Sequence, residues 1–218
     1  MNRPTRNIML SYKSDFSNQN HQLNVSISKH WFLLKNGNLK WQEKKLEVNW
    51  KNVYSKPKEN IVHFVIRDHF SNCYYGESHS ISNLPEIEAF LYRAWSKKEE
   101  YPFQGCPKTL FVPQTVFNIF PKIQNFKRNT SMNLEIPTSG FHGGIRVIRE
   151  WESQFKYFSL FCKGTYNLQF VQENIININI QGNGRTRDKK ESNIEKWASN
   201  LPGLILPGEK QNFFQFFE

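Results

Sequence analysis

The alternation of hydrophobic and polar residues is clearest in the segment 61–77. Residues 61–66 are apolar and mostly β-branched apart from His63, which predicts a strand buried on both faces. Turn-forming side chains follow at 68–72, and the aromatic residues after them predict a second strand that ends at Gly76. The pattern therefore predicts a central β-hairpin on which the other elements pack.

The chain before this hairpin is more polar. Residues 1–30 show only weak alternation, at 23–27, and are expected to form a loosely packed arm. Residues 31–34 and 39–41 flank an Asn-Gly pair, which is a strong signal for a short hairpin. Residues 46–54 alternate in their first half and predict a strand that leads into the central hairpin.

After the hairpin, helices and short strands alternate. Apolar residues at 87, 90, 91, 94 and 95 fall on one helical face, and Asn83 and Pro85 are placed to cap this helix. The order of elements indicates an α/β domain, and a meander of strands followed by such an alternation is the layout of an RNase H-like fold. The further expected elements are a strand at 108–112, a helix at 115–126 broken near Pro121, a strand at 134–136 and a helix at 145–158.

The C-terminal part has a different pattern. Residues 166–180 alternate like strands, a basic cluster follows at 185–190, and a short helix is expected at 194–198. The aromatic end at 213–217 must be buried in its own chain or against a partner. The expected organisation is an N-terminal arm and hairpin (1–45), a core (46–160) and a small β-rich C-terminal extension (161–218).

Composition restricts the class of protein. The chain has 218 residues and a formal net charge of +10, which favours a polyanionic partner, most often a nucleic acid. Cys73, Cys106 and Cys162 are far apart, so neither a disulfide framework nor a zinc site is expected. The sequence contains no apolar run long enough to predict a membrane span, and we expect a cytoplasmic protein.

Four segments, in order, resemble the catalytic core of retroviral integrases and the related DDE transposases. They are residues 46–50, 64–76, 105–112 and 139–145, and the resemblance covers about 46–158. It implies an RNase H-like mixed five-stranded sheet flanked by helices. It also implies a metal site in which three carboxylates hold two metal ions that activate a water or a 3′-hydroxyl.

The positions that match the three acids carry other residues. The resemblance places Asn49 at the first, Pro113 (followed by Gln114) at the second and Arg146 at the third. An asparagine keeps an oxygen without charge, a proline offers no side-chain ligand, and an arginine is a cation. No cofactor is therefore expected.

Displaced acids are the alternative. A slip of the alignment would make Glu150 or Glu152 the third acid, and Glu47 could replace Asn49 as the first. Asp68 is another carboxylate in the core, although its place in a turn favours a structural role. With such replacements the protein would retain Mg²⁺ and a nuclease or strand-transfer activity.

The leading hypothesis is a catalytically inactive, integrase-like protein that binds DNA, as an accessory factor in the recombination of a mobile element. A protein-interaction or oligomerisation module, forming a homodimer or binding a partner transposition protein, is an alternative, as is an active metal-dependent enzyme with displaced acids. The candidate DNA-binding residues are Lys44, Lys45, Lys51, His142, Arg146, Arg149, Lys156, Arg185, Arg187, Lys189 and Lys190.

Overall fold

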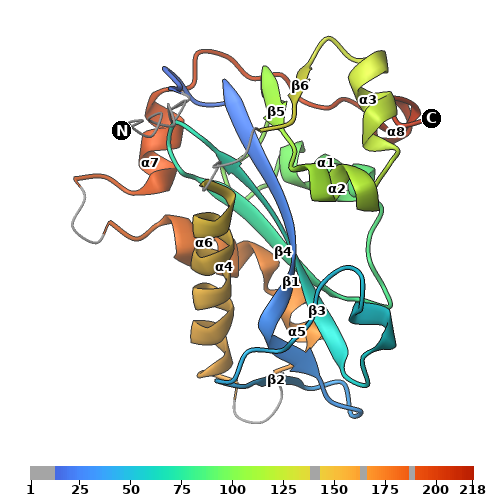
Figure 1. The fold of residues 1–218 in the computed structure, drawn as a ribbon. Coiled ribbons are helices and arrows are strands. Elements are labelled where there is room, and N and C mark those ends of the chain that lie inside the picture. Colours follow the sequence, from blue (N-terminus) through green and yellow to red (C-terminus); the bar gives the residue numbers. More distant parts are fainter. Residues whose placement is uncertain (1–12, 138–142, 163–165, 187–189) are drawn as a thin grey trace, which may run out of the picture.

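The computed structural model describes residues 13–137, 143–162, 166–186 and 190–218, with the backbone alone for residues 143–146. Within these residues a six-stranded sheet lies at the centre, and helices cover both of its faces (Figure 1). The strands are β1 (Asn20–Leu33), β2 (Leu39–Trp41), β3 (Glu59–Asp68), β4 (Tyr74–Ser80), β5 (Thr109–Phe111) and β6 (Asn133–Glu135). The helices are α1 (Ile87–Trp95), α2 (Gln114–Ile119), α3 (Ile123–Asn129), α4 (Gly143–Ser159), α5 (Leu168–Glu173), α6 (Ile175–Asn183), α7 (Asn193–Ser199) and α8 (Lys210–Gln215), with a 3₁₀ turn, η1, at Val53–Ser55.

The sheet has the order β4-β3-β1-β5-β6, and β2 pairs with the far end of β1. The pairs β1–β3 and β3–β4 are antiparallel, whereas β1–β5 and β5–β6 are parallel. The first strand of the chain is therefore the middle strand of the sheet. The expectation of a loosely packed arm over residues 1–30 is wrong for residues 20–30, because their weak alternation belongs to this strand.

The segment 46–54 does not form the predicted strand. Residues 45–49 have no regular structure, and η1 follows them in the connection between β2 and β3. The segment contacts β1 through a backbone hydrogen bond of 2.7 Å from the Leu46 N–H to the Lys29 carbonyl, but it forms no ladder with that strand. The short hairpin before it is confirmed, since Trp31 pairs with Trp41 across the Asn-Gly turn.

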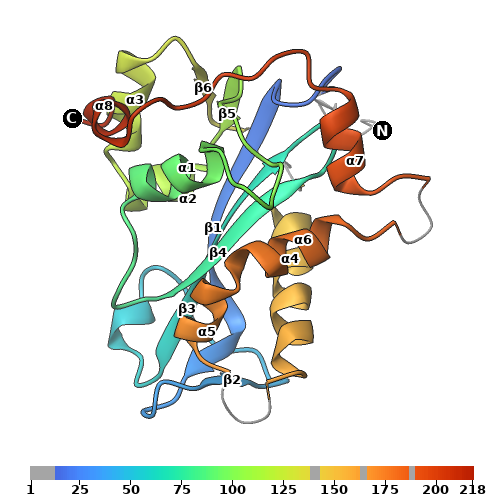
Figure 2. The same cartoon turned by 180° about the vertical axis from the view of Figure 1, so that it is seen from behind.

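Two hydrophobic cores lie on opposite faces of the sheet. The helices α1, α2, α3 and α8 pack on one face, and α4 with α5 and α6 packs on the other (Figure 2). The aromatic C-terminus belongs to the first core, where the rings of Phe126 and Phe217 stack with centroids 4.6 Å apart. Phe213 and Phe217 are thus buried within their own chain.

The remaining predicted elements are present, with corrections to five details. The strand β4 continues past Gly76 to Ser80, and α1 begins after Glu86 instead of being capped by Asn83. The segment 166–180, expected to form strands, contains α5 and most of α6. The sheet has six strands where five were expected, and the C-terminal residues that the structure describes are helical instead of β-rich.

The strand β1 bends where it passes α4. Its register with β3 shifts between Ile27 and Phe32, which marks a bulge. The Ser28 hydroxyl accepts hydrogen bonds from the backbone N–H groups of His30 and Trp31, at 3.3 and 3.1 Å. This bulge places Ser28 opposite the middle of α4.

Candidate functional site

One face of the central strand carries a row of polar side chains. Alternate residues of a strand point to the same face, and the row faces α4, since Ser28 contacts Glu152 of that helix. Its Ser26 hydroxyl donates a hydrogen bond of 2.7 Å to Oδ1 of Asn24. A strand in the middle of a sheet is usually apolar on both faces, so this row marks the candidate site. Its members are Gln22, Asn24, Ser26 and Ser28.

The strand register brings Asn24 close to the end of β5. The parallel pairs run from Asn20 with Thr109 to Gln22 with Phe111. Continuing this register by two residues places Asn24 beside Pro113, the residue at which β5 leads into α2. Neither of these two side chains carries a charge.

The helix α4 directs one carboxylate at the central strand. Oε1 of Glu152 accepts a hydrogen bond of 2.6 Å from the Ser28 hydroxyl and lies 3.3 Å from Nε2 of His63 on β3. Burial alone would raise the pKa of Glu152. The hydrogen bond and the charge interaction with His63, together with the Ser28 hydroxyl, instead lower that pKa below its ordinary value.

The same histidine continues this polar chain inward. Its Nδ1 lies 2.8 Å from the Ser78 hydroxyl and 3.2 Å from the indole nitrogen of Trp151, which donates. The indole N–H of Trp151 also lies 2.9 Å from the Ser78 hydroxyl, so His63, Ser78 and Trp151 form one buried polar group beside Glu152. A serine, a histidine and a glutamate in sequence resemble a hydrolytic triad, but His63 is fully buried and Ser78 is 1% exposed. We assign this chain of side chains a structural role, since it joins α4 to the sheet.

The acids and the asparagine singled out from the sequence lie in other places. Asn49 and Glu47 are exposed in the connection between β2 and β3, where Asn49 Oδ1 accepts from the backbone of Lys51. Asp68 is fully buried and fixes the turn between β3 and β4, because its carboxylate accepts hydrogen bonds from the backbone of Asn18 and Ser71. The structural role predicted for Asp68 is therefore confirmed.

The predicted basic residues are distributed over several surfaces. Arg149 and Lys156 are two turns apart on α4, and both are exposed. The Lys156 ammonium lies 3.6 Å from the ring centroid of Trp41, and the Arg185 guanidinium lies 4.7 Å from that of Tyr157. His142, Arg187 and Lys189 lie outside the described residues, and Arg146 is described only as part of the α4 backbone. The other predicted basic residues are exposed and belong to segments outside α4. They are Lys44, Lys45, Lys51 and Lys190.

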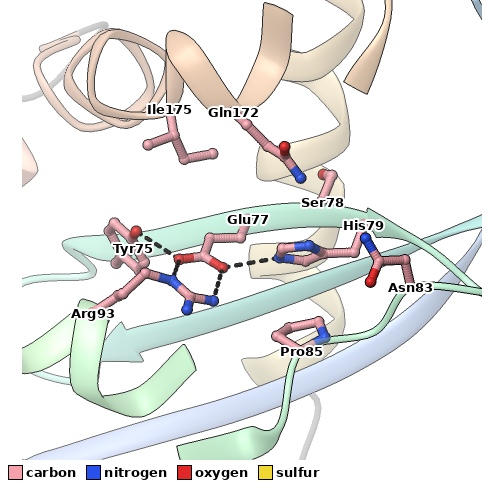
Figure 3. A pocket seen from close by; sticks show the side chains of 9 residues that line it. All are labelled: Tyr75, Glu77, Ser78, His79, Asn83, Pro85, Arg93, Gln172 and Ile175. Atoms are coloured by element: carbon pink, nitrogen blue, oxygen red, sulfur yellow. Dashed lines mark hydrogen bonds and ion pairs between the residues drawn. The ribbon is translucent and has the colours of Figure 1, made fainter. Parts of the chain in front are cut away.

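A second polar cluster, which sequence analysis missed, lines a cavity of about 390 Å³ beside β4 (Figure 3). Glu77 is its centre: Arg93 of α1 donates to both carboxylate oxygens at 2.7 Å, and the Tyr75 hydroxyl and His79 Nε2 lie 2.7 and 2.9 Å away. The three β4 residues alternate along one strand face. Their spacing could have revealed the cluster if the predicted strand had been extended past Gly76.

The Glu77 cluster predicts a pH dependence of stability. Burial opposes the charge of Glu77, but hydrogen bonds from Arg93 and His79 outweigh it and lower its pKa from 4.5 to about 2. A carboxylate with a lowered folded-state pKa stabilises the fold above the unfolded value and loses this contribution as the pH falls towards 2. We expect the native protein to lose about 3 kcal/mol more than Glu77→Gln between pH 5 and pH 2, measured by urea unfolding. Parallel pH profiles for the two proteins would contradict this assignment.

Among the side chains that the structure describes, no three His, Cys, Asp or Glu groups lie together as ligands for one metal ion. In the same residues, no helix has the length and apolar character needed to cross a bilayer. The carboxylate closest to the polar row, that of Glu152, is already engaged by Ser28 and His63.

Comparison with known proteins bears on the fold. No protein-family model matches the sequence, and no curated protein sequence matches it. Among solved structures, the chain is similar to the catalytic core domain of HTLV-2 integrase, determined in complex with magnesium in a trimeric form. The TM-score is 0.52 at 13% sequence identity, and the match covers 84% of this chain and 99% of that domain. The protein has the integrase core fold. The fold expected from the sequence resemblance is therefore confirmed.

Proposed function

We propose that this protein uses the integrase core fold to bind DNA without catalysing metal-dependent strand transfer. The observation that carries the proposal is the parallel register of β1 and β5, which, continued by two residues, brings Asn24 beside Pro113. The family resemblance puts the first acid on the first strand and the second acid directly after the strand that follows the first helix. In this fold those strands are β1 and β5, so we assign Asn24, instead of Asn49, to the first acidic position and Pro113 to the second.

The replaced residues remove the chemistry of a two-metal site. Mg²⁺ is held by hard, preferably charged, oxygen ligands, and two cations need several carboxylates to balance their charge. Asn24 offers one neutral amide oxygen, which already accepts a hydrogen bond from the Ser26 hydroxyl. Pro113 offers no side-chain ligand. Glu152, the fallback third acid, shares its carboxylate with Ser28 and His63. The residues therefore support an inactive site.

The charge of the chain supports DNA as the partner. With a net charge of +10 the protein attracts a polyanion, and α4 presents Arg149 and Lys156 on one exposed side. The lysine ammonium binds a phosphate as a point charge, and the arginine guanidinium binds it through two parallel hydrogen bonds. Binding releases counterions from the DNA, so the affinity for DNA falls as the salt concentration rises. We infer that the exposed side of α4 is the main DNA contact.

The test is fluorescence anisotropy with labelled duplex and branched DNA over a series of salt concentrations. We expect binding that weakens steeply with salt, and a loss of about tenfold or more in affinity for the double variant Arg149→Glu/Lys156→Glu. The matched control is Lys127→Glu/Arg128→Glu on α3, which changes the net charge equally on the opposite face of the sheet. Absent binding at low salt, or an equal loss in both variants, would overturn the proposal.

A second arm of this test addresses catalysis. The protein is incubated with labelled DNA ends and Mg²⁺ or Mn²⁺, beside Glu152→Gln and Glu150→Ala. We expect no cleavage or joining above the level of the variants. Cleavage by the native protein that disappears in Glu152→Gln would show that displaced acids maintain an active enzyme.

A further inference from the structure

The helix α6 runs along the free edge of β4 and hydrogen-bonds to it through asparagine side chains. Asn183 accepts from the Tyr74 N–H and donates to the Tyr74 carbonyl, each at 2.9 Å. Asn179 does the same for Gly76, at 2.8 and 3.0 Å. Four residues of a helix and two residues of a strand both advance by about 6 to 7 Å, so successive turns of α6 meet successive outward peptide groups of β4.

At the third position of this ladder α6 supplies no amide, although the carboxamide of Gln172 on α5 lines the same cavity (Figure 3). One further turn along α6 is Ile175, and two further residues along β4 is Ser78. Strand alternation directs the N–H and C=O of Ser78 to the same outer edge as those of Tyr74 and Gly76. The side chain of Ile175 contains no donor or acceptor, and both Ser78 and Ile175 line the cavity beside Glu77 (Figure 3). Within the described part of the chain, no side chain hydrogen-bonds to the N–H or C=O of Ser78. A buried peptide group without partners is costly, which makes this position a candidate contact for a ligand.

We propose that the cavity binds a small planar molecule in which a hydrogen-bond donor lies next to an acceptor, as in a nucleobase edge or a primary carboxamide. The molecule takes the place of a third asparagine and makes the same two hydrogen bonds to the backbone of Ser78. This site is separate from the polar row of β1 and does not depend on DNA binding.

The rest of the cavity suits such a ligand. Arg93 donates to Glu77 through Nε and Nη2, which leaves its Nη1 group outside the pair, and its side chain is 42% exposed. Nε2 of His79 also faces Glu77, so Nδ1 is the ring nitrogen available to a ligand. Pro85 and Ile175 supply apolar walls, and about 390 Å³ accommodates a single small molecule and not a polymer.

Binding is tested by calorimetry with the full chain and matched pairs of probes. Uridine is compared with 3-methyluridine, and nicotinamide with N,N-dimethylnicotinamide, because each methylated partner lacks the donor. We expect one or both unmodified probes to bind, and the methylated partner to bind at least about tenfold more weakly. The pair that responds distinguishes a nucleobase from a carboxamide. Failure of both probes to bind at millimolar concentration, or equal binding of the methylated forms, would overturn the proposal.

The mode of binding is tested at Ile175. Ile175→Asn supplies the missing amide and should abolish binding, whereas Asn177→Ala, on the exposed side of the same helix, should leave it intact. Nuclear magnetic resonance gives a readout that needs no variant, since the backbone amide proton of Ser78 should shift on addition of the probe and that of Gly76 should stay in place. Unchanged affinity in Ile175→Asn, or an unshifted Ser78 amide at saturation, would contradict the assigned position.

Discussion

Replacing Asn179 by alanine is expected to lower the free energy of unfolding by about 4 kcal/mol, because two buried peptide groups lose their partners. The side chain of Asn179 is fully buried and makes both outer hydrogen bonds of Gly76. A buried donor or acceptor left without a partner costs about 1–3 kcal/mol, and the gain in helix propensity from alanine returns only about 0.6 kcal/mol.

Urea unfolding of three alanine variants on α6 checks this explanation. Asn177 is exposed on the same helix, so Asn177→Ala should be neutral or slightly stabilising. Asn183→Ala should cost less than Asn179→Ala, since the Tyr101 hydroxyl also donates to the Tyr74 carbonyl and would remain. Equal losses for the exposed and the buried asparagine would show that the amide ladder adds nothing to stability.

The ladder also explains how β4 can be an edge strand. An uncovered edge presents unpaired N–H and C=O groups to other chains, and a covering helix is one of the ways in which proteins protect it. Here α6 covers Tyr74 and Gly76 and leaves Ser78 at the cavity. The ligand site that we propose is thus the part of the β4 edge that α6 leaves uncovered.

The same ladder explains why α6 could not be predicted from the sequence. Ile176, Ile178 and Ile180 alternate with asparagines, and β-branched residues favour strands, so the local pattern indicated a strand. The asparagines at 179 and 183 have helical spacing, but their partners are backbone groups about 100 residues earlier in the chain. A local pattern contains no information about such partners, and the tertiary contact determined the outcome.

The central strand was missed for a related reason. Its polar face reads as a solvated segment, because Asn24 and Ser26 lower the average hydrophobicity of residues that are otherwise well placed for a strand. Residues 46–50 resemble the first strand of the integrase core more closely than β1 does, yet they lie outside the sheet. The long periodic elements α1 and α4 and the apolar strand β3 were predictable because their own residues specify them. Of the two residues that we assign to the inactive site, the sequence resemblance indicated Pro113 and did not indicate Asn24.

Replacing Gly76 by alanine is expected to lower the free energy of unfolding by about 3–4 kcal/mol, because the site has no room for a methyl group. An added Cβ would lie 2.5 Å from Cε3 of Trp151, with two further ring atoms within 2.9 Å. The indole is fully buried and donates to the Ser78 hydroxyl at 2.9 Å, so it cannot move away without losing that bond. Urea unfolding beside Gly203→Ala, where an added Cβ meets nothing within 4 Å, measures the steric part of the loss.

A double-mutant cycle separates this clash from a general effect of alanine in the strand. Trp151→Leu is destabilising by itself, since it removes a large buried ring, but it makes room for the methyl group. Gly76→Ala should then cost less than about 1 kcal/mol in the Trp151→Leu background, which gives a coupling energy of about 3 kcal/mol. Additive losses would mean that the backbone of β4, and not the indole of α4, requires glycine here. Because Trp151 also donates to His63, the partner of Glu152, the clash should weaken the attachment of α4 to the sheet.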